Sequence, residues 1–202
     1  EDLSWAKEVA EAYGFELKVK TLDLRDVEEN LKIVVPLIED NNVVKVGVGM
    51  TFYAACEMAR EDGIRVIFSG LGSEEIFAGY DRHKKSSDVN KECLSGLRKI
   101  YERDTYRDDV ITMNNNLELR APFLDKELCD YALKIPAKHK MEKDRVKAIL
   151  RDVANDLGLD EKFAERKRKA AQYGSRLDKA LQALTKKNKF KLRSEYLKSL
   201  YS

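Results

Sequence analysis

The sequence has few of the residues that build disulfide frameworks or metal sites. It contains three cysteines and two histidines among 202 residues. Cys56, Cys93 and Cys129 lie 37 and 36 positions apart, so they form neither a C-x-x-C pair nor a zinc-binding pattern. His83 and His139 have no Ser, Cys or carboxylate partner at a suggestive spacing. These absences argue against a disulfide framework and a zinc site, and they favour a reducing, cytoplasmic environment.

Long apolar runs and a strong net charge are also absent. No apolar stretch approaches the roughly 18–20 residues of a membrane span. Residues 1–4 lack the basic and apolar regions of a signal peptide. The net charge of +2 gives the whole molecule no strong attraction to nucleic acid or to an anionic membrane. We therefore expect no membrane partner, and a nucleic-acid partner is not favoured.

What the chain does have is charge of both signs and enough apolar residues for a core. Hydrophobic residues make up 43% and charged residues 37% of the sequence. The Lys and Glu excess is a bias seen in proteins from hot environments. Residues 138–202 hold 19 Lys/Arg and 9 Asp/Glu, a local charge of +10, which leaves −8 for residues 1–137. A basic C-terminal third suits an anionic ligand, and a solvated basic tail explains it about equally well.

Helix and strand patterns alternate up to residue 85. This alternation predicts an α/β domain with a parallel sheet. The expected elements are helices over 4–13, 27–39, 51–61 and 74–80 and strands over 15–19 and 65–68, with 43–48 ambiguous. From residue 86 the helical period dominates. The expected helices there cover 91–105, 108–113, 126–133, 145–157 and 175–184, followed by a short or frayed helix over 186–202. The sequence thus predicts an α/β layer over 1–85 and a helical part with a basic tail over 86–202.

A glycine-containing turn, Ser69 to Ser73, follows the predicted strand at 65–68. Glycines at such a turn let the backbone approach a ligand, and the N–H groups of a turn and helix start form a cradle for anions. A plain tight turn has about equal weight, because G-x-G alone is a weak signal. Glu74 and Glu75 either complement the positive end of the helix dipole or coordinate magnesium on a bound phosphate.

Two later segments also concentrate polar residues. Glu118 and Arg120 precede an apolar A-P-F-L run, and we expect a buried ion pair that orients the loop rather than a catalytic pair. The basic run at 166–169 is of a kind that usually forms a solvated face. The small and apolar residues after it indicate a chain that turns back into the fold. A lysine there could then reach a phosphate or a developing negative charge.

Together these segments resemble the synthetase domain of the asparagine synthetase family, and asparagine-synthetase-domain-containing proteins in particular. The family shows S-G-E-G-S-D-E-x-F-x-G-Y after a strand, and this chain has S-G-L-G-S-E-E-I-F-A-G-Y. The resemblance extends over nearly the whole chain. Its segments are 69–80, the D-x-x-R of Asp104 and Arg107, E-x-R-x-P-F-L-D at 118–125, Y-A-L-x-I-P at 131–136, K-x-x-L-R at 147–151 and K-A-A-Q-Y-G-S at 169–175.

The resemblance implies an adenine-nucleotide α-hydrolase-like parallel sheet, incomplete at its N-terminus, followed by a helical cluster. It implies ATP and Mg²⁺ as cofactors, adenylation of a carboxylate such as aspartate, and attack by ammonia. By the same resemblance a set of residues would form the site. They are Ser69, Gly70, Gly72 and Ser73 against ATP, Glu74 as a magnesium ligand, Asp104 at the acyl-transfer centre, and Lys169, with Lys167 second, as the charge-stabilising lysine.

Three departures from the family pattern matter. Leu71 stands where the family has a glutamate, so we expect an acceptor other than aspartate. The family's S-G-G-x-D-S loop would lie upstream of Glu1, and we expect the natural chain to continue N-terminally by a strand and such a loop. Residues 1–202 alone are therefore expected to show no turnover. The glutaminase domain is absent as well, so ammonia would come free or from a separate glutaminase domain or chain.

Two other interpretations remain open. One is an ATP pyrophosphatase-type enzyme with a different acceptor, which Leu71 favours and the basic C-terminal third fits weakly. The other is a non-catalytic nucleotide-binding relative that has lost the chemistry. A homo-oligomer is compatible with all of these interpretations, and the sequence does not decide among them.

Overall fold

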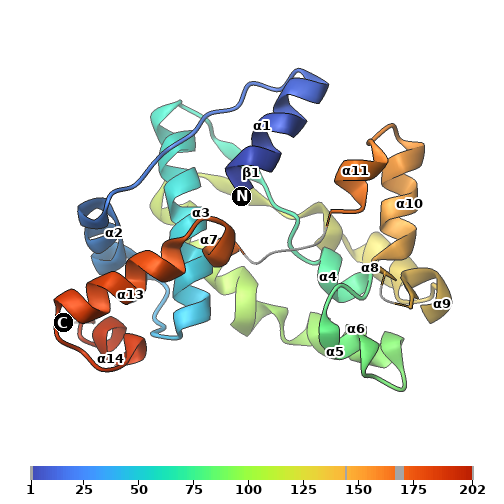
Figure 1. The fold of residues 1–202 in the computed structure, drawn as a ribbon. Helices are drawn as coiled ribbons and strands as arrows, with labels where there is room; N and C mark the ends of the chain where they lie inside the picture. The colour runs from blue at the N-terminus through green and yellow to red at the C-terminus, as the bar shows by residue number, and fades with distance from the viewer. Residues whose placement is uncertain (1, 144, 167–170, 202) are drawn as a thin grey trace. The chain divides into compact units, whose positions relative to one another are not determined.

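The computed structural model describes residues 2–143, 145–166 and 171–201 and is mostly helical with small sheets (Figure 1). The helices up to residue 100 are α1 (Asp2–Tyr13), α2 (Leu24–Leu37), α3 (Val43–Glu61), α4 (Ser73–Ile76), α5 (Asp81–Lys84) and α6 (Val89–Arg98). Those that follow are the π-helix η1 (Tyr101–Thr105), α7 (Tyr106–Asn114), the 3-10 helix η2 (Pro122–Leu124), α8 (Lys126–Ala132), α9 (Ala137–Lys140), α10 (Ala148–Asp156), α11 (Glu161–Ala164), α12 (Ala171–Gly174), α13 (Leu177–Lys187) and α14 (Arg193–Lys198). The strands are β1 (Val66–Phe68), β2 (Glu118–Arg120), β3 (Met141–Glu142) and β4 (Arg145–Val146).

The chain divides into two compact units that are each built from separate segments. The first unit comprises residues 1–67, 106–118 and 168–202, and the second comprises 68–105 and 119–167. Each unit therefore takes residues from both sides of position 85, where the sequence suggested a boundary. Within the described ranges, no helix has an apolar stretch long enough to cross a bilayer.

Side-chain caps explain where the two long N-terminal helices begin. The Asp23 carboxylate accepts hydrogen bonds from the Arg25 and Asp26 N–H groups at 2.7 and 2.9 Å and starts α2. Asn42 Oδ1 accepts from the Val44 N–H at 2.9 Å and starts α3. Such caps satisfy N–H groups that have no partner inside the helix. The ambiguous stretch at 43–48 is therefore the first part of α3, which continues through the helix expected at 51–61.

Two sequence expectations about this half of the chain are wrong. Residues 15–19 form no strand, and Phe15 is 66% exposed. A strand needs a neighbour for its N–H and C=O groups, and the sheets of the described residues pair only β1 with β2 and β3 with β4. The helix expected over 74–80 stops at Ile76, because Ala78 adopts a left-handed φ of 59° that breaks the helical path.

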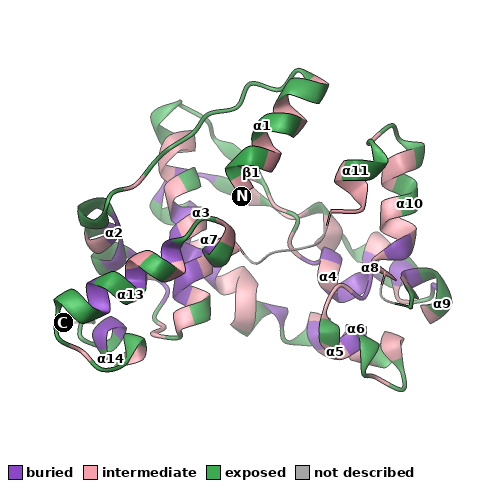
Figure 2. Ribbon diagram, in the orientation of Figure 1, coloured by how far each residue is buried: buried purple, intermediate pink, exposed green. Residues whose placement is uncertain are grey.

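The first unit has a continuous apolar core. Helix α3 contacts α2, α7, α12, α13 and α14. Figure 2 shows buried segments along α3 and α13, whereas α1 has no buried residue. The core side chains recur at helical spacing. They include Val27, Leu31, Val34 and Val35 of α2, Val46, Met50, Tyr53 and Cys56 of α3, and Leu177, Leu181 and Leu184 of α13.

The second unit has a smaller apolar cluster of Ile76, Phe77, Cys129, Ala132 and Ile135. Helix α4 contacts α6 and η2 there, and α10 contacts α9 and α11. All three cysteines of the chain are free and buried, which confirms the expectation that they form no disulfide framework. The helix expected over 145–157 begins only at Ala148, because 145–146 pair with 141–142 as an antiparallel hairpin.

Candidate functional site

The turn that follows β1 is held by local hydrogen bonds. The Ser69 N–H donates to the Arg120 carbonyl at 2.9 Å, and the Leu71 N–H donates to Ser69 Oγ at 3.2 Å. The Ser73 N–H donates back to the Gly70 carbonyl at 3.3 Å. These bonds fix the path of the turn, so the predicted nucleotide-binding residues lie on one ordered segment of the second unit.

The two glycines of the turn are glycine for different reasons. Gly72 has a φ of +95°, and a Cβ there would lie 2.5 Å from Leu124 Cδ2. A side chain at this position would be both strained and in collision with η2. A Cβ at Gly70 would meet no atom within 4 Å. The fold therefore requires glycine at 72, whereas no contact of the described residues requires it at 70.

Glu74, the predicted magnesium ligand, already has two partners. Its Oε1 accepts from Lys147 Nζ at 3.0 Å, and its Oε2 accepts from Ser73 Oγ at 2.9 Å. Lys147 has a left-handed φ of 54° at the start of α10. Its side chain is 20% exposed and that of Glu74 is 16% exposed, so the pair is largely shielded from water. Sequence reasoning gave Lys147 no role, although it is the first residue of the K-x-x-L-R segment.

A second group of paired charges begins at Glu75, the residue that follows Glu74. Glu75 is 1% exposed and forms an ion pair with Arg103, whose Nε donates to Asp104 Oδ2 at 2.6 Å. The Arg103 guanidinium also lies 5.2 Å from the centre of the Tyr80 ring. Burial and then the charge of Glu75 raise the pKa of Tyr80, so its phenol stays protonated. The predicted acyl-transfer carboxylate, Asp104, thus has an arginine neighbour that sequence reasoning missed.

Asp104 and Arg103 belong to the π-helix η1, which leads directly into α7. One-turn π segments inside helices are frequent at functional sites. Nothing in the residue spacing predicts this segment, because the expected helix over 91–105 has an uninterrupted helical period. Among the described residues there is no cluster of three or more His, Cys, Asp or Glu side chains that could hold a metal ion.

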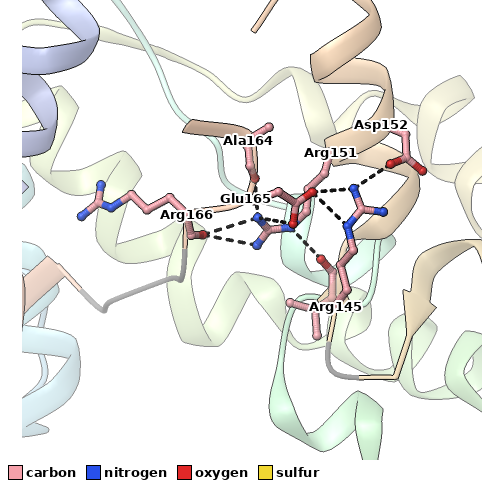
Figure 3. Close-up of polar contacts among 7 residues, drawn as sticks. Arg145, Arg151, Asp152, Ala164, Glu165 and Arg166 are labelled. Atoms are coloured by element: carbon pink, nitrogen blue, oxygen red, sulfur yellow. Dashed lines mark hydrogen bonds and ion pairs between the residues drawn. The ribbon is translucent and has the colours of Figure 1, made fainter. Parts of the chain in front are cut away.

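Arg151, the last residue of K-x-x-L-R, ties α10 to the segment after α11 (Figure 3). Its Nε donates to the Val146 carbonyl at 2.9 Å. Its terminal nitrogens donate to the carbonyls of Ala164 and, at 3.4 Å, of Arg166. One guanidinium thereby satisfies three backbone carbonyls on two segments of the second unit.

Arg145 reinforces this arrangement. It donates to Glu165 Oε1 at 2.9 and 2.5 Å and to Asp152 Oδ1 at 2.6 Å (Figure 3). These bonds raise the pKa of Arg145, and the bond from Arg145 lowers the pKa of Glu165. The clamp formed by Arg145, Arg151 and Glu165 fixes the start of the basic segment. Lys167 and Lys169, the predicted charge-stabilising lysines, lie outside the described residues.

Glu118 and Arg120 do not form the buried ion pair that the sequence suggested. Both are exposed on β2, with the partly buried Leu119 between them. The expectation of a buried ion pair is wrong, because a strand sends successive side chains to opposite faces and 118 and 120 share the exposed one.

Comparison with known proteins places the chain in a family. The profile of the family "Asparagine synthase" matches residues 1–92 and 82–198. A relative from Methanocaldococcus jannaschii, provisionally named as a glutamine-hydrolyzing asparagine synthetase, is 34% identical over 228 aligned residues, 94% of this chain and 42% of the relative. The glutamine-hydrolyzing asparagine synthetase of Homo sapiens is 32% identical over 164 residues, 78% of this chain and 29% of the human protein.

An asparagine synthetase domain-containing protein of Saccharomyces cerevisiae is also similar. It is 36% identical over 115 residues, 55% of this chain and 21% of the yeast protein. The chain therefore spans less than half the length of these relatives. The match to the family profile nonetheless covers almost every residue, including the turn, the Glu74–Lys147 pair and the clamp. The chain belongs to the asparagine synthase family.

Proposed function

We propose that this chain acts in ATP-dependent amide synthesis by the adenylation route. An oxygen of the acceptor carboxylate attacks the α-phosphorus of ATP, and the bond to pyrophosphate breaks. Ammonia then attacks the acyl carbon, the bond to AMP breaks, and the nitrogen loses a proton. Membership of the asparagine synthase family supports this chemistry. The observation that carries it is the open backbone at Gly70 beside the shielded Glu74–Lys147 pair.

In this proposal the turn binds ATP and other segments of the chain handle charge. Ser69, Gly70, Gly72 and Ser73 lie along the nucleotide, and Asp104 lies at the acyl-transfer centre. Lys169, or Lys167, neutralises charge that develops on the phosphoryl and acyl groups. These assignments rest on the family resemblance, as do the parallel α-hydrolase-like sheet and a glutaminase partner.

Glu74 would give a magnesium ion one carboxylate ligand. Mg²⁺ commonly binds one or two carboxylates together with phosphate oxygens and water. When bound, the metal would neutralise the charge of the departing pyrophosphate. The Lys147 ammonium on Glu74 Oε1 gives this carboxylate a cation in the described structure. Glu74 would thus exchange or share that partner when Mg·ATP binds.

We further propose that the acceptor is not aspartate. A carboxylate that holds ammonia and takes up its proton would contribute about 10²–10⁴ in rate. Leu71 offers no such group, and it is partly buried on the turn. An apolar wall at this point suits a less polar acceptor. The experiment on Leu71 is an asparagine-formation assay of the intact protein, wild type beside Leu71→Glu. Efficient asparagine formation by wild type would refute this part.

The nucleotide site is tested by two substitutions of neighbouring glycines. Gly70→Val places its side chain in open space, so we expect the melting temperature to stay unchanged and the affinity for Mg·ATP to fall at least tenfold by calorimetry. Ser87→Val, at an exposed loop position of the same unit, is the matched control and should leave both unchanged. Gly72→Val should instead unfold the turn, because it collides with Leu124.

Each outcome discriminates among the interpretations. Equal Mg·ATP affinity in wild type and Gly70→Val would place the nucleotide elsewhere. In the intact protein, binding of Mg·ATP without release of pyrophosphate for any carboxylic acid or other acceptor would favour the non-catalytic relative. Release that depends on an acceptor other than a carboxylic acid would favour the pyrophosphatase-type alternative.

A further inference from the structure

The last two helices of the first unit, α13 and α14, are joined by a strongly basic segment (Figure 1). We call residues 186–193 the basic loop. Residues 186–198 hold six Lys or Arg residues and one Glu, whereas the net charge of the whole chain is only +2. The basic loop is therefore a local concentration of charge. Its exposed cations are Lys186, Lys187, Lys189, Lys191 and Arg193.

The basic loop is an ordered part of the first unit. Lys189 adopts a left-handed φ of 63°, and the Phe190 N–H donates to the Thr185 carbonyl at 3.0 Å, which closes the turn after α13. Tyr196 and Leu197 of α14 are 3% and 0% exposed and belong to the apolar core of the unit. The segment after the loop is thus a short packed helix and not a frayed tail. Its packing holds the charges of the loop in place.

Most of these cations have no acidic neighbour. Lys187 is the exception, because its Nζ lies 2.8 Å from Glu28 Oε2. Glu195, the acidic residue of the segment, accepts from the Leu192 N–H at 3.1 Å and caps α14. Like charges that lie close together repel one another, and a bound polyanion would relieve that repulsion. The cations that form no ion pair with a described carboxylate are Lys186, Lys189, Lys191 and Arg193.

The chemistry of the basic loop favours an extended polyanion over a small ion. Lysine ammonium groups are compact, strongly hydrated charges on flexible stems. A small anion is held instead by polar groups that converge in a concave pocket. A nucleic-acid duplex carries one negative charge for about every 1.7 Å of its axis, and the release of its condensed counterions drives binding to exposed cations. A row of solvent-exposed cations therefore suits a duplex.

The apolar residues of the segment argue against two other anionic partners. Phe190 packs against the buried Tyr196 with ring centroids 5.6 Å apart, so neither ring is a platform for unpaired bases. Membrane association of a helix needs an apolar face that can insert. Leu192 is 58% exposed, but Tyr196 and Leu197 of α14 are buried in the core. Neither a single strand nor a lipid surface has the contacts that it requires.

We propose that the basic loop is a docking surface for the phosphate backbone of a double-stranded nucleic acid. The four cations without an ion pair make the contacts, and Lys187 stays with Glu28. Contacts of this kind position a protein on a duplex and carry no sequence information. The docking surface lies wholly in the first unit and needs neither the turn at 69–73 nor any reaction. A test of this surface and a test of the proposed function can therefore fail separately.

The test measures the binding of the intact protein to a labelled DNA duplex of mixed sequence by fluorescence anisotropy. We expect a dissociation constant of about 10⁻⁴–10⁻⁶ M at physiological salt, which is typical of binding without sequence preference. Four phosphate contacts predict that the logarithm of the binding constant falls with the logarithm of salt concentration with a slope of about −3 to −4.

Two matched variants locate the surface. The loop variant replaces the four cations without an ion pair by Gln, and we expect its affinity to fall at least tenfold and its salt slope to approach zero. The control variant replaces three Lys and one Arg at exposed positions of the second unit, Lys85→Gln, Lys91→Gln, Arg98→Gln and Lys99→Gln. Both variants lose the same charge, so the control separates the loop from net charge. Lys191→Gln alone should lower the slope by about 1, and it decides if the loop variant fails to fold.

Equal losses of affinity in the two variants would overturn the proposal, and so would the absence of binding by wild type at low salt. Three other probes are titrated in the same buffer, namely the single strand of the same sequence, polyglutamate and vesicles that contain phosphatidylserine. We expect the duplex to bind most tightly, because its charge density is the highest of the nucleic-acid forms. Binding of any other probe as tightly as the duplex, with loss in the loop variant, would overturn the duplex as the partner and identify that class instead.

Discussion

The two units differ in the size of their apolar cores. The first unit packs α2, α3 and α13 around a continuous apolar core. The second has a small apolar cluster and buries Glu75, His83 and Lys140. Apolar packing needs only shape and volume, whereas a buried charge needs a specific partner. Both units bury charged residues, because the first also buries the Arg107–Asp108 ion pair. The first unit has in addition the larger apolar core, whereas the second, which carries the candidate nucleotide turn, has only the small apolar cluster.

The largest expected effect is in the core of the first unit. Leu184 is fully buried in α13, and Leu184→Ala should lower the free energy of unfolding by about 2–5 kcal/mol through lost burial and a residual cavity. Leu24→Ala, at a position 47% exposed in α2, is the matched control. Denaturant titration of both variants measures the difference. Equal losses would mean that the apolar core does not stabilise this unit.

A smaller but still large effect is expected where the second unit buries charge. Arg103→Met keeps an aliphatic stem but leaves Glu75, at 1% exposure, without its cation. We expect a loss of about 3 kcal/mol in the free energy of unfolding. Arg98→Met in α6, an exposed position, should change little. A stable Arg103→Met variant would contradict the idea that polar pairing holds this unit together.

The same unit should be the more sensitive to acid. Burial and then the charge of Arg82 lower the pKa of His83 to about 4, and its Nδ1 accepts from the Tyr80 N–H at 3.1 Å. The unfolded chain binds this proton near pH 6.5, so stability is full above pH 6.5 and is lost as the pH falls toward 4. The free energy of unfolding should fall by about 2–3 kcal/mol over this pH range.

His83→Asn keeps an acceptor and cannot titrate, so its stability should be flatter between pH 6.5 and 4. His139→Asn, at an exposed position, is the control and should retain the wild-type pH dependence. Urea titrations at several pH values make the comparison. The explanation fails if wild type and His83→Asn lose stability in parallel.

The smallest expected effect is at an exposed ion pair of the second unit. Lys126 Nζ lies 2.7 Å from Asp130 Oδ2 in α8, but their side chains are 87% and 56% exposed. Exposed pairs of this kind contribute little in water. Lys126→Ala should leave the unfolding midpoint unchanged within error. A clear fall in the midpoint would show that the exposure of an ion pair does not predict its contribution to the stability of this unit.

Local sequence signals predicted much of the fold because they act between neighbours. Helical period placed α1, α2 and α8, and the β-branched run at 65–68 placed β1. The alternation of apolar and polar residues at 15–19 predicted a strand that does not form. A strand also needs a neighbouring strand, which the pattern of one segment does not reveal. The turn at 69–73 was found from its glycines, but their separate reasons, open space at Gly70 and contact with Leu124 at Gly72, depend on residues far along the chain.

The sequence by itself determined the family, the positions of most helices and the turn that would bind a nucleotide, because short motifs and period are carried by adjacent residues. Only the tertiary structure decided that Lys147 pairs with Glu74, that Arg151 holds the carbonyls before the basic segment, and that Gln172 lines an apolar cavity. Each of these contacts joins residues brought together by packing of helices. Their partners are selected by distance in space, which no spacing in the sequence specifies.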